Sequence, residues 1–164
     1  MAKPNWLEEL AENWFRIRKY ITQLHVRVPV FGRLELDLLA FNDEELLLVD
    51  LQTYIGERGT VNNEAGRVIK SFRIYDRLLK TPPYESLARG RKIQRLFIAG
   101  GTANAYREFK SCTKNSGIVF MPIEDFISAV VHEIRPYVAA QRWPFPSDDI
   151  SRLMYQLIAF DFIK

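Results

Sequence analysis

Two aspartates interrupt leucine-rich runs that otherwise have the composition of a protein core. Asp37 lies within LELDLLAF (34–41), and Asp50 lies within ELLLVDLQ (45–52). Between the two runs, Asn42-Asp43-Glu44 is a turn signal. The alternation of apolar and polar residues predicts two antiparallel strands joined as a hairpin.

The length of the turn decides whether the two acids meet. A two-residue loop at Asp43-Glu44 sets Asp37 directly across from Asp50, and Glu35 across from Gln52. Strand alternation then puts these four side chains on one face of the hairpin. The other face is filled by Leu36, Leu38, Val49 and Leu51. A three-residue loop would instead set Asp37 and Asp50 on opposite faces.

Carboxylates that oppose each other across two strands repel, so the pair needs a neutralising partner. Mg²⁺ is suited to this, since it is held in proteins by one or two carboxylates together with phosphate oxygens. Such an ion lowers the pKa of bound water and stabilises charge on a transferring phosphoryl group. Gln52 could orient the water or a phosphate oxygen through its amide. The alternative is that both acids lie on a solvated face without an ion.

The remaining elements follow from periodicity and breakers. Asn5 and Glu8 form a capping-box pattern, and the apolar stripe Trp6, Leu10, Trp14, Ile17 and Ile21 predicts a helix over 5–21. Further strands are expected at 25–31, 94–99 and 118–121, and further helices at 62–79, 102–112, 123–138 and 148–160. Thr81-Pro82-Pro83 ends the second helix. This order predicts an α/β fold with a mixed sheet, an antiparallel meander followed by parallel strands, and helices on both faces.

The segment GRLELDLLAFNDEELLLVDLQT (32–53) resembles the core of the PD-(D/E)xK, or restriction-endonuclease-like, nuclease superfamily. It is similar to proteins of the archaeal Holliday-junction-resolvase kind. The first motif appears as Glu35-Leu36-Asp37-Leu38-Leu39-Ala40, and the second as Val49-Asp50-Leu51-Gln52-Thr53. The resemblance covers about residues 5–100 and includes the order of helix, three-strand meander, helix and strand.

The resemblance implies a restriction-endonuclease-like fold in which Asp37 and Asp50 hold Mg²⁺ or Mn²⁺. Gln52 takes the place of the family's lysine, and Glu8 corresponds to a further metal-associated acid on the first helix. Glutamine brings no positive charge to a developing oxyanion. Either the site cuts DNA (or, less favoured, RNA) with Gln52, or the domain is an inactive nuclease-like module that binds nucleic acid or a protein partner.

Basic residues offer two candidate phosphate contacts. Arg89, Arg91 and Lys92 precede the fourth predicted strand, where they could bind nucleic acid or form an ordinary solvated loop. On the helix 62–79, Lys70 or Arg67 could approach the acids and partly replace the missing lysine, or belong to a solvated face.

Composition limits the remaining function classes. The chain has 164 residues, a net charge of +3 and 48% hydrophobic residues, which predicts one folded domain with a core over about 5–122 and a helical extension over 123–164. The single cysteine, Cys112, provides neither a disulfide framework nor a zinc cluster. The apolar runs are too short to cross a membrane. A cytoplasmic protein is expected, without a membrane partner, as a monomer or a homodimer.

Overall fold

The computed structural model describes residues 5–28, 34–56, 59–142 and 149–159. In these residues the helices are α1 (Trp6–Ile17), α2 (Val61–Leu78), α3 (Tyr84–Ala88), α4 (Ala103–Thr113), α5 (Ile123–Ala139) and α6 (Asp149–Ala159). The strands are β1 (Ile21–Arg27), β2 (Glu35–Phe41), β3 (Glu45–Gln52), β4 (Lys92–Ala99) and β5 (Ile118–Pro122). None of the described helices is long and apolar enough to cross a membrane.

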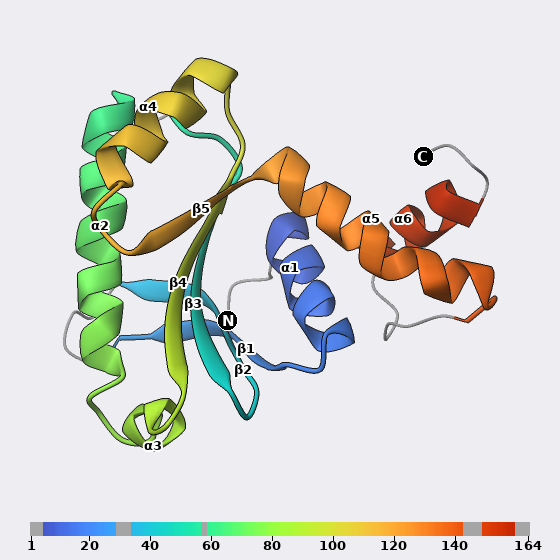
Figure 1. Ribbon diagram of the computed structural model, residues 1–164, viewed down its shortest axis with the longest axis horizontal. Helices are drawn as coiled ribbons and strands as arrows, with labels where there is room; N and C mark the ends of the chain where they lie inside the picture. The colour runs from blue at the N-terminus through green and yellow to red at the C-terminus, as the bar shows by residue number, and fades with distance from the viewer. Residues whose placement is uncertain (1–4, 29–33, 57–58, 143–148, 160–164) are drawn as a thin grey trace.

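The described strands form one sheet with the spatial order β1-β2-β3-β4-β5 (Figure 1). The pairs β1–β2 and β2–β3 are antiparallel, whereas β3–β4 and β4–β5 are parallel. The parallel pairs need crossover connections, and helices between the strands supply them. The predicted α/β architecture with a mixed sheet is therefore confirmed.

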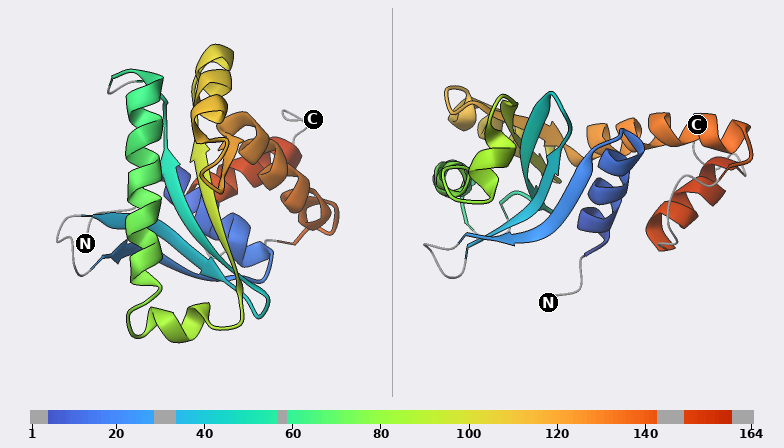
Figure 2. Two further views of the ribbon diagram at one scale, coloured as in Figure 1. Left: turned by 60° about the vertical axis from the view of Figure 1, so that its left-hand side comes forward. Right: turned by 90° about the horizontal axis from the view of Figure 1, so that it is seen from below.

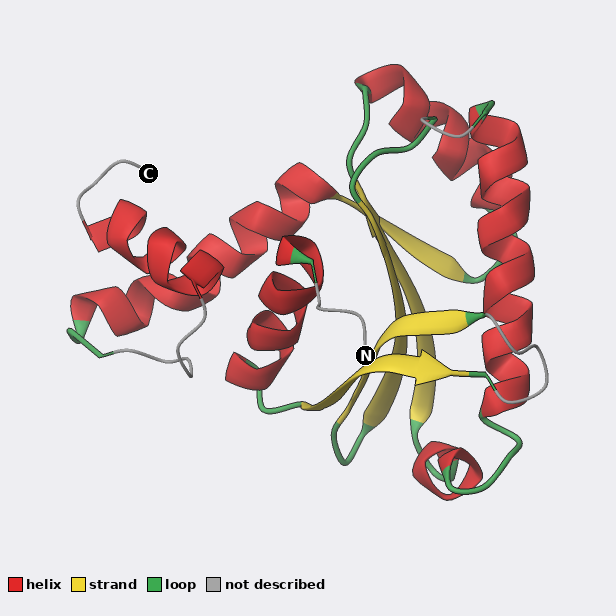
Figure 3. Cartoon of the chain, turned by 180° about the vertical axis from the view of Figure 1, so that it is seen from behind, coloured by secondary structure: helices red, strands yellow, loops and turns green. Residues whose placement is uncertain are grey.

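Helices cover both faces of the sheet (Figures 2 and 3). One face packs against α2 and α4 through a buried cluster that includes Phe72, Phe97 and Phe109. The opposite face packs against α1 and α5 through a cluster that includes Phe15, Val49 and Phe126. A strand buried on both faces loses the simple alternation of apolar and polar residues, which accounts for the continuous run Leu46–Val49.

The first helix is shorter than predicted, and the first strand starts earlier. Lys19 has a φ of +69°, a left-handed conformation that ends a helix, and β1 begins at Ile21. Ile21 is 63% exposed and Trp6 is 39% exposed, so neither belongs to the buried stripe. Residues 29–31 of the predicted first strand lie outside the described residues.

The Pro-Pro stop is followed by structure that periodicity did not predict. The short helix α3 begins after Pro83, and β4 begins at Lys92, two residues before the expected start. Within α5, Pro136 is tolerated in the last turn. The other predicted helices and strands lie within one residue of their expected bounds.

Gly100 fixes the loop after β3 against the end of β4. Its N–H donates to the Gln52 carbonyl at 3.2 Å, and its own carbonyl accepts from the Ile55 N–H at 2.7 Å. A Cβ at position 100 would lie 2.3 Å from the Thr53 carbonyl oxygen. Only glycine allows this approach, which holds the chain directly after Gln52 in place.

Replacing this glycine should destabilise the protein. Gly100→Ala is expected to lower the free energy of unfolding by about 1–3 kcal/mol, because the backbone of the neighbouring loop must move. Gly66→Ala is the matched control: Gly66 lies within α2 and a Cβ there meets nothing within 4 Å, so a gain of about 0.5–1 kcal/mol is expected. Urea unfolding of the three proteins measures both changes, and equal stability of Gly100→Ala and wild type would contradict this loop geometry.

Candidate functional site

The β2–β3 hairpin has the two-residue loop on which the prediction depended. Leu38 pairs with Val49, and Phe41 pairs with Leu46. Asn42 closes the turn, because its side-chain oxygen accepts from the N–H groups of Glu44 and Glu45, each at 2.9 Å. The predicted register is confirmed, and the next rung of this ladder brings Asp37 to Asp50.

At that rung, side chains replace the regular backbone pairing. Asp37 Oδ2 accepts a hydrogen bond from the Leu51 N–H at 2.7 Å. The carboxyl groups of Asp37 and Asp50 also lie close enough for each to shift the pKa of the other. Because both pKa values are raised, the pair carries less negative charge near neutral pH than two free aspartates.

The other side of Asp37 is also irregular, because β1 changes conformation at His25. His25 has a φ of +54°, and the β1–β2 register passes from Leu24↔Leu38 to Val26↔Leu36 without a His25–Asp37 pair. Beyond this break, the side chains exchange faces.

This exchange corrects the predicted faces. Leu36 packs in the cluster under α2, whereas Leu38 packs in the cluster under α1. Glu35 therefore does not share a face with Asp37. Its carboxylate lies 2.6 Å from His25 Nδ1, and His25 Nε2 lies 3.4 Å from a carboxylate oxygen of Glu8. Regular alternation was assumed through Asp37, and the left-handed residue on the neighbouring strand breaks it.

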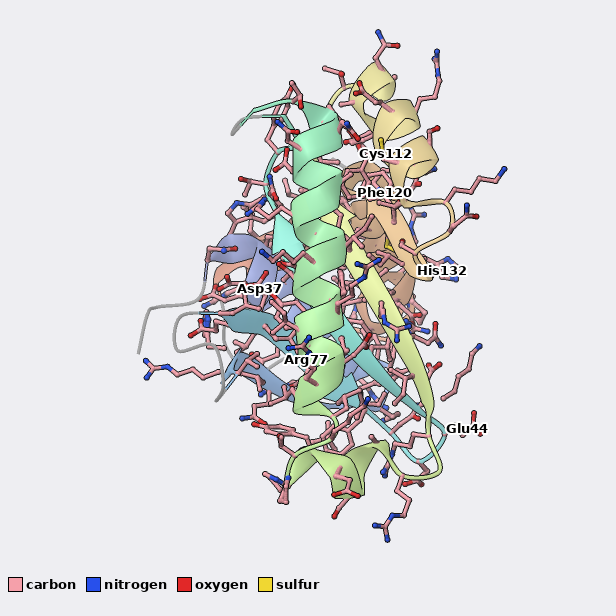
Figure 4. All side chains as sticks on the ribbon, turned by 90° about the vertical axis from the view of Figure 1, so that its left-hand side faces the viewer. Asp37, Glu44, Arg77, Cys112, Phe120 and His132 are labelled. Atoms are coloured by element: carbon pink, nitrogen blue, oxygen red, sulfur yellow. The ribbon has the colours of Figure 1, made fainter. Side chains whose placement is uncertain are left out.

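The acids line a polar cavity of about 300 Å³ beside α2. The residues that line it are Asn5, Asp37, Asp50, Leu51, Gln52, Thr53, Arg67, Val68 and Ser71. They come from the start of α1, from β2, from the end of β3 and from α2. Figure 4 shows Asp37 at one edge of α2. The three predicted residues Asp37, Asp50 and Gln52 thus meet at one site.

Burial and mutual proximity set the protonation of the two acids. Desolvation, followed by the charge and the hydrogen bond of Asp50, raises the pKa of Asp37 to about 9. Desolvation likewise raises the pKa of Asp50, against the opposing effects of the Asp37 hydrogen bond and the Arg67 charge. The pKa of Tyr75, which lies in α2, is raised by burial and then by Asp50 and Asp37. At neutral pH the pair therefore holds a proton.

Gln52 does not project freely into the cavity. Its amide N–H donates to the Glu64 carboxylate and, at 2.7 Å, to the Tyr54 carbonyl. Arg67 Nη2 donates to Gln52 Oε1 at 2.9 Å and to Glu64 Oε1 at 3.2 Å. Glu64 is 4% exposed and also accepts from the Gly56 N–H. Gln52 and Glu64 together hold Arg67 at the cavity.

Glu8 lies near the site, but its oxygens already have partners. One oxygen accepts from the Asn5 backbone N–H and the other from the Asn5 side-chain amide, each at 2.8 Å, in the predicted capping box. His25 approaches the same carboxylate. Glu8 is 7% exposed, and its charge contributes to the raised pKa of Asp37. It acts on the acid pair through its charge rather than as part of the cavity lining.

The basic residues before β4 lie at the far end of the sheet. Lys92 is in register with Glu45, at the start of β3, while Asp50 lies near its end. Arg91 donates to the carbonyls of Asn42 and Leu87, so its guanidinium holds the hairpin turn and α3. Arg89 is exposed beside Glu85. The structure does not bring this cluster to the acids.

The two candidate cations of α2 have different positions. Arg67 lines the cavity, whereas Lys70 is exposed on α2 and is not part of the cavity lining. Of the two alternatives, Arg67 is therefore the one that approaches the acids.

Sequence reasoning missed the partners that surround the acid pair. Nothing in the sequence distinguishes Glu64 and Ser71 from other polar residues of the predicted helix. The group of Glu8, His25 and Glu35 is formed by three elements, α1, β1 and β2. The β1–β2 register could have found His25, because the pairs Leu24↔Leu38 and Val26↔Leu36 leave His25 and Asp37 between them. That register depends on the connection through residues 29–33, whose length the hydrophobic pattern does not define.

Asp37 and Asp50 are the residues that could hold a divalent ion, provided that the ion keeps part of its own hydration. The described residues contain no group of three or more His, Cys, Asp or Glu side chains arranged to hold a metal. Mg²⁺ commonly uses one or two carboxylates and completes its shell with water and substrate phosphate. Asp37 and Asp50 line a polar cavity and provide two such carboxylates.

Comparison with protein-family models, with curated proteins and with solved structures gives no match to this chain. The functional assignment therefore depends on the chemistry of the site.

The raised pKa values predict how stability depends on pH. Between about pH 4 and 9 the folded protein retains a proton on the pair that the unfolded chain releases, so stability falls as the pH rises. Asp37→Asn removes one titrating group and keeps an acceptor for Leu51. The free energy of unfolding of Asp37→Asn minus that of wild type should therefore be at least about 1 kcal/mol larger at pH 8.5 than at pH 5.

Urea unfolding at the two pH values, with a chelator present, measures this difference. Asp43→Asn serves as the control, because Asp43 is exposed in the hairpin turn. An Asp37→Asn effect that is the same at both pH values would contradict a shared proton.

Proposed function

We propose that the cavity around Asp37 and Asp50 is the active site of a Mg²⁺- or Mn²⁺-dependent endonuclease that hydrolyses phosphodiester bonds in DNA. One observation carries the proposal: two neighbouring carboxyl groups line a polar cavity beside a guanidinium held in place by other side chains. This combination suits a cation and a phosphate in the same space. The resemblance to the PD-(D/E)xK superfamily supports the same reading, with Asp37 and Asp50 at the motif positions.

The acid pair would hold the ion after losing its shared proton. Full ionisation of both carboxylates is unfavourable in the protein alone, and a divalent charge reverses that preference. The Leu51 N–H keeps Asp37 oriented during this change. A bound Mg²⁺ supplies water activation and stabilisation of phosphoryl charge.

Arg67 would contribute the positive charge that Gln52 lacks. Its guanidinium lines the cavity and can donate to a phosphate oxygen while Gln52 and Glu64 retain it. Gln52 then acts as a positioning residue for Arg67. Because the donor is held before a substrate arrives, little reorganisation opposes its interaction with developing charge.

A second candidate function is a nuclease-like module that binds nucleic acid or a protein partner without cutting. The observation that favours it is that Gln52 makes its hydrogen bonds within the protein. The acid pair is likewise satisfied by a shared proton. In such a module, the site would be a relic of a catalytic arrangement.

A cleavage assay separates the two functions. Supercoiled and branched DNA are incubated with the protein and Mg²⁺ or Mn²⁺. We expect Asp50→Asn to lower the cleavage rate by about 10²-fold or more, because an amide cannot supply the carboxylate charge to the ion. Asp43→Asn should cleave like wild type. Equal rates for wild type and Asp50→Asn would exclude this site, and an absence of cleavage by wild type would favour the inactive module.

Ion binding can be measured without catalysis. Mn²⁺ should raise the free energy of unfolding, by about 2.7 kcal/mol at a concentration one hundred times Kd. The gain should be larger at pH 8.5 than at pH 5.5, because the ion competes with the shared proton. Thermal unfolding of wild type and Asp50→Asn provides the measurement. A gain of equal size in Asp50→Asn would place the ion elsewhere.

A further inference from the structure

We propose that the outer face of α2 is the nucleic-acid-docking surface. One strand of the substrate would run from the acid cavity, across α2, to a second polar pocket on the other side of this helix. The inference rests on the proposed function for the identity of the ligand. It adds a binding surface and a second phosphate subsite to it.

The first observation is the charge pattern of α2. Arg67, Lys70, Arg73 and Arg77 are all exposed, at spacings of three or four residues that put them on one side of the helix. Like charges at these spacings repel, so the arrangement has a cost in the free protein. Among the described residues, neither Lys70 nor Arg73 forms an ion pair. A polyanion would remove the repulsion.

Of the acids of α2, Glu64 pairs with Arg67, whereas neither Glu64 nor Asp76 pairs with Lys70 or Arg73. Glu64 is buried and binds Gln52, Arg67 and the Gly56 N–H. Asp76 is paired with Arg95 of β4, whose Nη2 lies 2.9 Å from Asp76 Oδ1. Both carboxylates are thus directed towards the body of the protein, and the outer face of α2 stays positive.

The second observation is a polar cavity of about 190 Å³ between α2, β4 and the turn before β5. Arg73, Asp76, Arg95, Asn115 and Ser116 supply its polar lining. Two guanidiniums face a single carboxylate there, which leaves a net positive charge. An anion with several acceptor oxygens, such as a phosphate, fits this set of donors.

The two cavities lie on opposite sides of α2. Arg67, Val68 and Ser71 are the α2 residues that line the first cavity, whereas Ile69, Phe72, Arg73 and Asp76 line the second. Figure 4 views this helix from outside, with Asp37 beside one edge. Lys70 and Arg73 lie on the exposed face of α2 between the two cavities.

Salt-dependent DNA binding tests the surface. Fluorescence anisotropy of a labelled single-stranded oligonucleotide is measured over a range of KCl concentrations, with a chelator present to prevent cleavage. For a single strand, each lost phosphate contact reduces the slope of log Kobs against log [salt] by about 0.7. Arg73→Gln and Lys70→Gln should each show this reduction, together with an affinity about 3–10-fold weaker at low salt.

Two further variants serve as comparisons. Arg135→Gln is the matched control, because Arg135 is exposed on α5, on the opposite face of the sheet, and should leave affinity and slope unchanged. Arg89→Gln tests the basic cluster before β4 and should also have no effect. If Arg89→Gln lowers the slope of log Kobs against log [salt] and Arg73→Gln does not, the proposal that α2 is the docking surface is wrong. Failure of wild type to bind the oligonucleotide at low salt also overturns it.

Inorganic phosphate distinguishes a nucleic-acid subsite from a site for a free anion. If phosphate stabilises wild type but not Arg73→Gln against thermal unfolding, while the oligonucleotide does not bind, the second cavity takes a free anion and the docking surface is overturned. The cleavage assay remains independent. Absence of cleavage with an intact Arg73 effect contradicts the endonuclease alone, whereas cleavage without an Arg73 effect contradicts the docking surface alone.

Discussion

Asp37 and Asp50 lie where the β2–β3 ladder would form its next pair, and two ionised carboxylates at that distance repel strongly. Their neighbours limit this repulsion in three ways. A proton is shared between the two side chains, the Leu51 N–H is donated to Asp37, and Arg67 approaches from α2. The cavity exists because the backbone pairing of β2 with β3 stops where the side-chain contacts of Asp37 and Asp50 begin. The lining of the cavity is polar because each group that limits the repulsion between the two acids must itself be polar.

The break at His25 determines what surrounds the acids. A continuous β1–β2 ladder would keep Leu36 and Leu38 on one face, and it would hold Glu35 beside Asp37. With His25 in a left-handed conformation, Glu35 instead joins His25 and Glu8 on the α1 side. Four carboxylates are thereby separated into two environments. The aspartates lie beside α2, whereas Glu35 contacts His25 Nδ1, and His25 Nε2 lies 3.4 Å from Glu8. Separation of this kind limits the negative charge that gathers at the cavity.

The hairpin and its turn could be predicted because local signals agree there: the two apolar runs locate the strands, and Asn42 selects the loop. The mixed sheet followed from the order of elements. The left-handed residues Lys19 and His25 could not be predicted, since neither is a glycine and tertiary contacts impose their conformation. The burial of Glu64 could not be predicted either. A carboxylate in the first turn of a helix is ordinarily solvated, and its burial depends on how the loop after β3 folds back, which Gly100 determines from a distant part of the chain.

Glu64 also limits which cations the site can use. A lysine in place of Gln52 would bring its ammonium to the carboxylate that now binds Arg67, and one buried carboxylate neutralises only one such charge. Glutamine, which donates to Glu64 and accepts from Arg67, links the two residues without adding charge. A lysine at position 52 would therefore compete with Arg67 for the contact with Glu64 that holds the guanidinium at the cavity.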